Sequence, residues 1–474
     1  MPTRRDQAQS YQFMMQRVVS AFAHHDTDPV QPAGRRLLGA GLGGVMVAVL
    51  CLAAVGVYAV LRPGGSTSWR DGNSIIVEKE TGTRYVFRQG VLYPMANYSS
   101  ALLALDSKGE SVRVSAQSLL GVPRGPLLGI VGAPDALPSA DRLLGTPWTL
   151  CAAPALDDSG QPATLTTLRV GAPVGSGREL GDDALLAQLS QTGKLYLIWH
   201  HRRYEIANDG IVLTALGLAQ QPRVPVSAAL LDTLPAGTRI AARAVAGRGT
   251  PSTAIPGSRV GQVLYVDNPG TPRQHFVVAD AHTLAPITEV EANILLADPA
   301  TQTAYPGEWP RLRQLSLAQA ATAAKREAPA RTDDSPPATT PRVMTPATSS
   351  SAVCAEFRDA TSPPAIIADV PAPAAAVGSA VRQRSAAGVA LADRIEVAPG
   401  RAAIVEAMPS ADATVGTRYL VTDLGVRHLL SQPDLQDRLG YQGVTPAHLP
   451  AGLVARVPPG PSLDTVAAGL PVLN

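Results

Sequence analysis

The sequence contains one glycine pattern that could bind a nucleotide. Residues 39–44 read GAGLGG, so Gly39, Gly41 and Gly44 match G-x-G-x-x-G. This pattern binds a dinucleotide only where it follows a strand and opens a helix, because free backbone N–H groups must face the pyrophosphate. Here PAGRRLL precedes it and a long apolar run follows it. The surroundings therefore favour a membrane helix over a nucleotide-binding loop.

Other residues with catalytic or metal-binding potential lack a supporting pattern. The sequence has no G-x-x-x-x-G-K-[ST] loop, no H-E-x-x-H and no G-x-S-x-G. His200 and His201 are adjacent, and on a strand they would point to opposite faces, so they could not ligate one metal ion together. Asp182 and Asp183 lie in a turn flanked by glycine. We therefore predict no catalytic residue and no metal site.

The apolar run after the glycine pattern predicts a transmembrane helix. Residues 37–61 contain no Asp, Glu, Lys or Arg, and Arg35, Arg36 and Arg62 bracket them. A helix needs about 20 residues to cross a hydrocarbon core of about 30 Å. A cleaved signal peptide would have a shorter apolar region closer to the N-terminus. We expect one uncleaved span.

Small residues lie four apart within this predicted span. The pairs are Gly39 with Gly43 and Ala40 with Gly44. Such spacing lets the backbone of a second helix approach closely. The alternative is that the glycines have no such role, because glycine is common in membrane helices.

Charge and cysteine usage indicate the orientation of the chain. The Arg35–Arg36 pair precedes the span, whereas the charges beyond it are mixed, so the positive-inside rule predicts a cytoplasmic N-terminus. Most of the chain then lies outside the cytoplasm, where disulfides persist. Cys151 and Cys354 are the two outer cysteines, and one intramolecular bridge is their simplest arrangement. Unpaired or intermolecular thiols are the alternative.

The cytoplasmic arm predicts an amphipathic helix. Its apolar residues follow a helical period and fall on one face: Tyr11, Met14, Met15, Val18, Val19 and Phe22. Such a helix can lie on the bilayer or dock on a partner protein. The polar face has no cluster of Lys and Arg, so protein docking is favoured.

Composition excludes one class of function and indicates the character of the outer region. The net charge of +2 gives no reason to expect nucleic-acid binding. The 42 Gly and 42 Pro residues suit a β-rich body with many turns. Residues 318–351 have almost no large apolar side chains, so we expect a disordered linker there.

Four stretches share one pattern, which predicts repeated units. Each begins with Gly, continues as an apolar strand with a Tyr, turns, returns as a second strand and ends in a short helix. The strand tyrosines are Tyr85, Tyr196, Tyr265 and Tyr419. A P-x-G phrase follows the first, second and fourth units, within residues 119–134, 230–249 and 448–463.

A hairpin with one helix buries little surface, so the units must pack on a common core. We predict an α+β, mainly β, extracytoplasmic region: a central β core with four hairpin-plus-helix repeats in a pseudo-two-fold arrangement. The expected boundaries are 1–36 for the cytoplasmic arm, 37–61 for the membrane helix, 62–145 for repeat 1, 146–192 for the first part of the core, 193–260 for repeat 2, 261–317 for repeat 3, 318–351 for the linker, 352–415 for the second part of the core and 416–474 for repeat 4.

These features together resemble the EccB family, the single-pass membrane components of type VII (ESX) secretion systems. The resemblance rests on the order of SYQFMMQR (10–17), GTRYVFRQGVLYPMANYSSALL (82–103), PRGPLLGIVGAPDALP (123–138), PWTLC (147–151) and Cys354. It implies a disulfide-linked outer body, self-association, and assembly with EccC, EccD and EccE components into a pore-forming complex. The N-terminal residues that match the family's docking helix, or extend its face, are Tyr11, Phe13, Met14, Arg17, Val18 and Phe22.

The resulting hypothesis is a structural and assembly subunit of a secretion channel in the cell membrane. Two alternatives remain open. Family members are sometimes labelled ATPases, which makes ATP the one cofactor that the resemblance suggests, so the enzyme question stays open. The repeats could instead anchor the machinery to the cell envelope.

Overall fold

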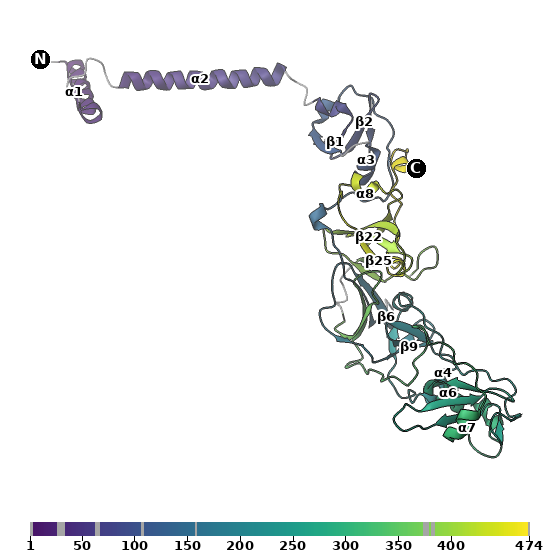
Figure 1. Ribbon diagram of the computed structural model, residues 1–474. Helices are drawn as coiled ribbons and strands as arrows, with labels where there is room; N and C mark the ends of the chain where they lie inside the picture. Colours follow the sequence, from purple (N-terminus) through teal and green to yellow (C-terminus); the bar gives the residue numbers. More distant parts are fainter. Residues whose placement is uncertain are drawn as a thin grey trace.

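The computed structural model of the chain describes residues 3–25, 34–61, 67–105, 109–156, 159–372, 379–380 and 384–472. Two helices come first: α1 (Arg4–His24) and α2 (Gly34–Leu61). Figure 1 shows α2 standing apart from an elongated body that contains the described strands. The charge-free run thus lies in one continuous helix, and Arg62, expected to close it, lies outside the described residues.

Repeat 1 is a four-stranded sheet with one helix. Its elements are β1 (Ser74–Glu78), β2 (Arg84–Arg88), β3 (Val91–Pro94), α3 (Tyr98–Ala104) and β4 (Glu110–Val114). The strand order is β3-β2-β1-β4, with β1 antiparallel to β2 and parallel to β4. Ile75 and Ile76 of β1 are fully buried, so the first strand supplies apolar surface that a lone hairpin lacks.

Three further sheets repeat this order of strands. Repeat 2 consists of β8 (Leu185–Leu189), β9 (Leu195–Trp199), β10 (Arg202–Glu205), α4 (Asp209–Ala215) and β11 (Val224–Val226). Repeat 3 consists of β14 (Val263–Val266), β15 (Gln274–Val278), β16 (Leu284–Ile287), α6 (Glu289–Ala297) and β17 (Arg313–Gln314). Repeat 4 consists of β22 (Ala402–Met408), β23 (Thr417–Thr422), β24 (Arg427–Leu429), α8 (Leu435–Arg438) and β25 (Ala447–Pro450).

The first strand of each sheet changes two sequence-based expectations. LLAQLS (185–190) and AAIVEAM (402–408) lie within the ranges expected for the core, but they form β8 and β22 and pair with the tyrosine strands of repeats 2 and 4. In repeat 3, Tyr265 lies on the first strand, β14, and the second strand is β15. A period-2 pattern predicts a strand but does not predict the strand with which it pairs, which explains both differences.

A short parallel segment closes each repeat at its third strand. In repeat 1, the Leu92 N–H donates to the Pro123 carbonyl, and the Leu92 carbonyl accepts from the Gly125 N–H. The equivalent groups are Arg203 with Pro235 and Gly237, Arg427 with Pro458 and Gly460, and Leu284 with Ala324 and Arg326. The P-x-G phrases are therefore edge segments of repeats 1, 2 and 4.

Seven of the remaining strands form one sheet, which is the core. The strand order is β20-β21-β6-β5-β18-β19-β7. Their bounds are β5 (Trp148–Leu156), β6 (Pro162–Arg169), β7 (Arg178–Glu179), β18 (Ala352–Phe357), β19 (Ala365–Val370), β20 (Ser379–Ala380) and β21 (Arg394–Glu396). Shorter elements complete the body: α5 (Ala228–Leu231), β12 (Pro251–Ser252), β13 (Ser258–Arg259), α7 (Leu317–Thr322), α9 (Ala451–Val454) and α10 (Thr465–Ala468).

The units follow one another along the body as repeat 1, repeat 4, core, repeat 2 and repeat 3 (Figure 1). One buried apolar cluster joins repeats 1 and 4, a second joins the core to repeats 2 and 4, and a third joins repeats 2 and 3. Helix α3 contacts α8, and α4 contacts α6. The chain therefore runs outward from repeat 1 to repeat 3 and returns to place repeat 4 beside repeat 1.

The segment expected to be a disordered linker, 318–351, has defined structure. It begins within α7, continues as the edge segment of repeat 3, and reaches the residue before β8, where the Met344 N–H donates to the Ala184 carbonyl. Met344 is buried, and Arg342 pairs with Asp183 at 2.7 Å. Backbone hydrogen bonds to neighbouring repeats fix this segment, which compensates for its small apolar content.

Candidate functional site

The glycine pattern lies inside a helix. Gly39, Gly41 and Gly44 belong to α2, which begins at Gly34, so their N–H groups face the carbonyls of the preceding turn. A phosphate-binding loop needs such groups unpaired. A Cβ built on any of these glycines, or on Gly43, would meet nothing within 4 Å. The glycines therefore leave an open surface on α2.

Helix α2 has the length and composition of a membrane span. Among the described residues, it is the one helix that meets both criteria, over Leu38–Tyr58, and none of that stretch is buried. Ala40 and the glycines lie near its N-terminal end. The small residues thus lie within the stretch where a second helix in the bilayer could pack.

Helix α1 presents its apolar side chains to solvent. A capping box between Thr3 and Asp6 begins the helix: the Thr3 N–H and hydroxyl both donate to the Asp6 carboxylate, at 2.9 and 2.6 Å. These bonds lower the pKa of Asp6. The large apolar side chains are 49–86% exposed: Tyr11, Phe13, Met14, Met15, Val18, Val19 and Phe22. No described part of the body covers these side chains.

Phe13 does not share the stripe. Two residues beyond Tyr11, it points to the other side of the helix, where the Arg17 guanidinium lies 5.8 Å from the centre of its ring. The predicted docking residues therefore divide into two groups. Tyr11, Met14, Val18 and Phe22 form the apolar stripe, and Phe13 with Arg17 forms a cation–π pair on a different face.

His200 and His201 do not lie on a strand, contrary to our expectation. They are the two turn residues between β9 and β10, with φ of 46° and 61°. His200 Nε2 lies 3.1 Å from the Asp182 carboxylate, and His201 Nδ1 lies 2.8 Å from the Pro364 carbonyl. The turn thus ties repeat 2 to the core. In the part of the chain that the structure describes, no group of three potential ligands could hold a metal ion.

The neighbouring carboxylate has a structural partner as well. Asp183 accepts two hydrogen bonds from the Arg342 guanidinium, at 2.8 and 2.7 Å, which lower its pKa. This pair fastens the segment before the core strand β18 to the start of repeat 2. Both aspartates of the glycine-flanked turn are thus engaged in holding elements together.

Cys151 and Cys354 form a disulfide across the centre of the core sheet. They are directly opposite each other on the antiparallel strands β5 and β18, and both are buried. β5 leads outward to repeats 2 and 3, and β18 receives the chain on its return. The bridge therefore joins the strand by which the chain enters the outer half of the body to the strand by which it returns.

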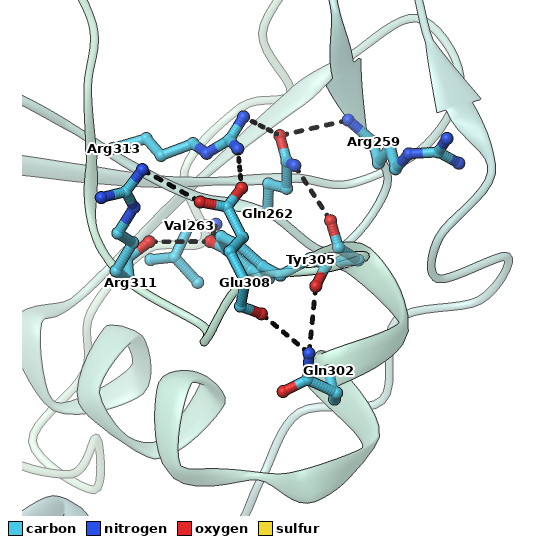
Figure 2. A network of polar contacts seen from close by, with 9 residues as sticks. Arg259, Gln262, Val263, Gln302, Tyr305, Glu308, Arg311 and Arg313 are labelled. Carbon is cyan, nitrogen blue, oxygen red and sulfur yellow. Dashed lines mark hydrogen bonds and ion pairs between the residues drawn. The ribbon is translucent and has the colours of Figure 1, made fainter.

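Repeat 3 contains a polar network that was not predicted from the sequence (Figure 2). Tyr305 is fully buried; its hydroxyl accepts from the Val263 N–H at 2.8 Å and donates to the Arg311 carbonyl at 2.9 Å. The Gln262 amide donates to the Ala304 carbonyl at 2.9 Å. Burial raises the pKa of Tyr305, so the hydroxyl keeps its proton and can donate. The phrase YPGEWPRLR, with an aromatic on each side of a Pro-Gly turn, was the available signal.

Charged groups complete this network. The Glu308 carboxylate pairs with Arg311 at 2.9 Å and also with Arg313. Gln302 donates to the carbonyls of Tyr305 and Glu308. The loop between α6 and β17 is thus anchored on both sides of Trp309.

Comparisons with known proteins agree on one family. A family model described as "Type VII secretion system ESX-1, transport TM domain B" matches residues 1–471. The chain is 26% identical over 488 residues to the ESX-3 secretion system ATPase EccB3 of Mycolicibacterium smegmatis, covering 97% of this chain and 89% of that protein. It is 36% identical over 228 residues to the ESX-2 secretion system ATPase EccB2 of Mycobacterium tuberculosis, an alignment that spans 46% of this chain and only 44% of EccB2.

Solved structures have the same fold. A chain of an intact ESX-5 inner membrane complex aligns with a TM-score of 0.62 at 25% identity, covering 100% of this chain and 96% of that one. A chain of the EccB3 dimer from the ESX-3 core complex aligns with a TM-score of 0.60 at 22% identity, covering 84% of this chain and all of that one. The likeness extends from the N-terminal helices to the last repeat.

Proposed function

The chain belongs to the EccB family of type VII (ESX) secretion components, and on that premise we propose that it is a structural and assembly subunit of a secretion complex in the cell membrane. It spans the membrane once through α2, docks on its partners inside through α1, and self-associates outside through the repeat body. The observation that carries the proposal is the exposed apolar stripe of α1, joined directly to a membrane span.

The orientation follows from the charges beside α2. Arg35 and Arg36 precede the apolar stretch, and the positive-inside rule puts such a pair in the cytoplasm. The N-terminus is then cytoplasmic, and the body with its disulfide lies outside, where a bridge between Cys151 and Cys354 persists.

The partners are the EccC, EccD and EccE type components, with a homodimer or higher oligomer of this chain. Support comes from the relatives: one solved structure is an inner membrane complex, and another is an EccB3 dimer. The open surface at Gly39, Ala40, Gly43 and Gly44 suits packing against a second membrane helix, because nothing in the described chain occupies it.

An approximate two-fold axis through the core relates the pair formed by repeats 1 and 4 to the pair formed by repeats 3 and 2. The support is that each pair meets through the same element: α3 contacts α8, and α6 contacts α4. The domain division proposed from the sequence is kept with three changes: β8 is assigned to repeat 2, β22 to repeat 4, and the edge segment at residues 324–326 to repeat 3. Such symmetry gives the body two similar ends, of which repeat 1 faces the membrane span.

ATP hydrolysis has less support in this chain, although the curated relatives are named ATPases. The glycine pattern of residues 39–44 lies within α2, and its N–H groups are committed to the helix. Anchoring to the envelope polymer also has no particular observation in its favour. Of these three roles, assembly is the one that makes use of the exposed apolar stripe of α1.

The test is co-purification of the full-length chain with the other membrane components. Val18→Asp places a charge in the apolar stripe, and Phe13→Asp removes the cation–π pair; we expect each to abolish co-purification. Gln16→Asp, on an exposed polar position of the same helix, is the matched control and should keep it. The proposal fails if the Val18 and Phe13 variants both co-purify as the wild type does.

A further inference from the structure

We propose that Trp309, in the loop between α6 and β17 of repeat 3, is the anchor of a binding site for another protein of the secretion assembly, one that presents an apolar slot edged by carboxylates. This inference rests on the proposed function. It concerns a contact made by repeat 3 outside the membrane, independent of docking through α1.

The loop that holds Trp309 is an insertion found in one repeat. In repeat 3, residues 298–312 separate the helix α6 from the last strand, β17. The equivalent connections span only 105–109, 216–223 and 439–446 in the other repeats. The sheets of the other three repeats close with shorter connections. Closing the sheet therefore does not account for the extra residues of repeat 3, and the insertion has another purpose.

The insertion is held rigidly at its start as well as around Trp309. Asp298 caps the short helix η4 (Pro299–Ala304), and it pairs with the largely buried Arg248 at 2.8 Å. Further along, Tyr305 and Glu308 are fixed by the contacts of Figure 2. An ordered loop loses little conformational entropy on binding, which favours affinity.

The side chain of Trp309 makes none of the contacts that hold the loop. Its side chain is 84% exposed, whereas Trp69 and Trp148 are fully buried and Trp199 is partly buried. Pro310 follows it and restricts its backbone. A large apolar side chain presented on a rigid loop has the character of a binding anchor, since tryptophan and arginine dominate the hot spots of protein interfaces.

The charges around Trp309 indicate the chemistry of the partner. Arg311 and Arg313 both pair with the single carboxylate of Glu308 in this network (Figure 2). Arg311 is 70% exposed, so part of its guanidinium remains free to pair with an incoming group. A surface that is apolar at its centre and positive at its edge is complementary to an apolar slot with carboxylates at the rim.

The location favours a protein over the bilayer. Repeat 3 is at the opposite end of the body from repeat 1, which follows α2 in the chain (Figure 1). Lipid headgroups are therefore remote from Trp309. A second copy of this chain and an envelope glycan are the rival occupants, and the experiment is designed to separate them.

The experiment is hydroxyl-radical footprinting read by mass spectrometry, because tryptophan oxidation reports directly on exposure in the unmodified protein. Three samples are compared: the full-length chain purified alone at several concentrations, the same chain with solubilised peptidoglycan fragments, and the intact membrane assembly. We expect oxidation of Trp309 to fall by roughly an order of magnitude in the assembly only, as for a side chain that becomes a desolvated anchor. Trp69 and Trp148 serve as unreactive internal references.

Charge variants test the nature of the rim. Arg311→Glu should restore oxidation of Trp309 in the assembly, whereas Arg311→Lys should keep it protected. Tyr305 is the check on loop integrity, since it becomes reactive only if the loop opens.

The proposal is overturned if Trp309 stays reactive in the assembly, if concentration alone or glycan protects it, or if Arg311→Glu leaves it protected. An assembly that forms through α1 while Trp309 stays reactive would refute this site and leave the proposed function standing.

Discussion

The ring of Tyr204 lies directly over Gly237. A Cβ built on Gly237 would lie 2.2 Å from Cε1 of Tyr204, a side chain with no exposed surface. The same relation joins Tyr93 to Gly125 at 2.4 Å and His428 to Gly460 at 2.5 Å. The glycine of each P-x-G phrase is thus required because a ring on the third strand covers it. In repeat 3, Ala285 replaces the ring and Arg326 replaces the glycine.

We predict that Gly237→Ala destabilises the body by about 1–3 kcal/mol, because the added methyl group overlaps a buried ring. The measurement is the free energy of unfolding of the full-length chain in detergent. Gly210→Ala is the matched control: a Cβ there meets nothing within 4 Å, and the residue lies in α4, where alanine is the better helix former. Equal stabilities of the two variants would contradict the prediction.

The sequence was sufficient for the features that depend on local patterns. A charge-free run predicted α2, Gly-x-x-Tyr predicted the strands β2, β9 and β23, although as the first strand of each unit, and two outer cysteines left one intramolecular pairing. Gly261 and Tyr265 have one residue more between them, which was the available sign that this strand differs.

Features that depend on distant partners were not predictable. Nothing local tells that β8 pairs with β9, or that residues 324–326 run beside Leu284. The turn at His200–His201 could have been predicted, because it occupies the position of Gln89–Gly90 in repeat 1. The backbone φ is positive at both residues of each turn. The order of the repeat 3 loop was not predictable, since it comes from two distant contacts: Gln262 bonds to the Ala304 carbonyl, and the Tyr305 hydroxyl bonds to the Val263 N–H.

His428 should make repeat 4 less stable as the pH falls. Burial lowers the pKa of His428 below its ordinary value of 6.5, although the hydrogen bond between Nδ1 and the Pro461 carbonyl opposes this. The unfolded chain therefore binds a proton at a higher pH than the folded one. The contribution to stability is complete above pH 6.5 and is lost as the pH falls toward the lower folded-state pKa.

We expect His428→Tyr to flatten this loss, because repeats 1 and 2 have Tyr93 and Tyr204 at the equivalent position. The check is the unfolding free energy between pH 7.5 and about pH 5, a range that spans the ordinary histidine pKa. His25→Asn is the control, since His25 is an exposed residue at the end of α1. Parallel pH curves for the wild type and His428→Tyr would refute the role of this histidine.

The disulfide should stabilise the body substantially. Cys151 and Cys354 are 203 residues apart in sequence, so the bond restricts a long loop of the unfolded chain. Replacing both with alanine should cost about 2–5 kcal/mol. A reductant should lower the melting temperature of the wild type and of Cys51→Ala, a control that removes the free cysteine of α2, and should leave the double alanine variant unchanged. If the disulfide of the wild type is shown to be reduced and the melting temperature does not change, the prediction is wrong.

The glycine face of α2 should contribute to pairing of membrane helices. Gly43→Leu fills the open surface beside Gly39 and should weaken self-association of α2 in a bilayer by on the order of 1 kcal/mol, because the two backbones can no longer approach closely. Gly56→Leu is the matched control: its Cβ also meets nothing within 4 Å, but the helical period places it on a different face. Both changes add the same apolar side chain, so insertion is affected equally and only the face differs. The measurement is energy transfer between labelled full-length chains in liposomes. If both variants associate as the wild type does, the glycines do not form the contact; if both weaken equally, the effect does not belong to this face.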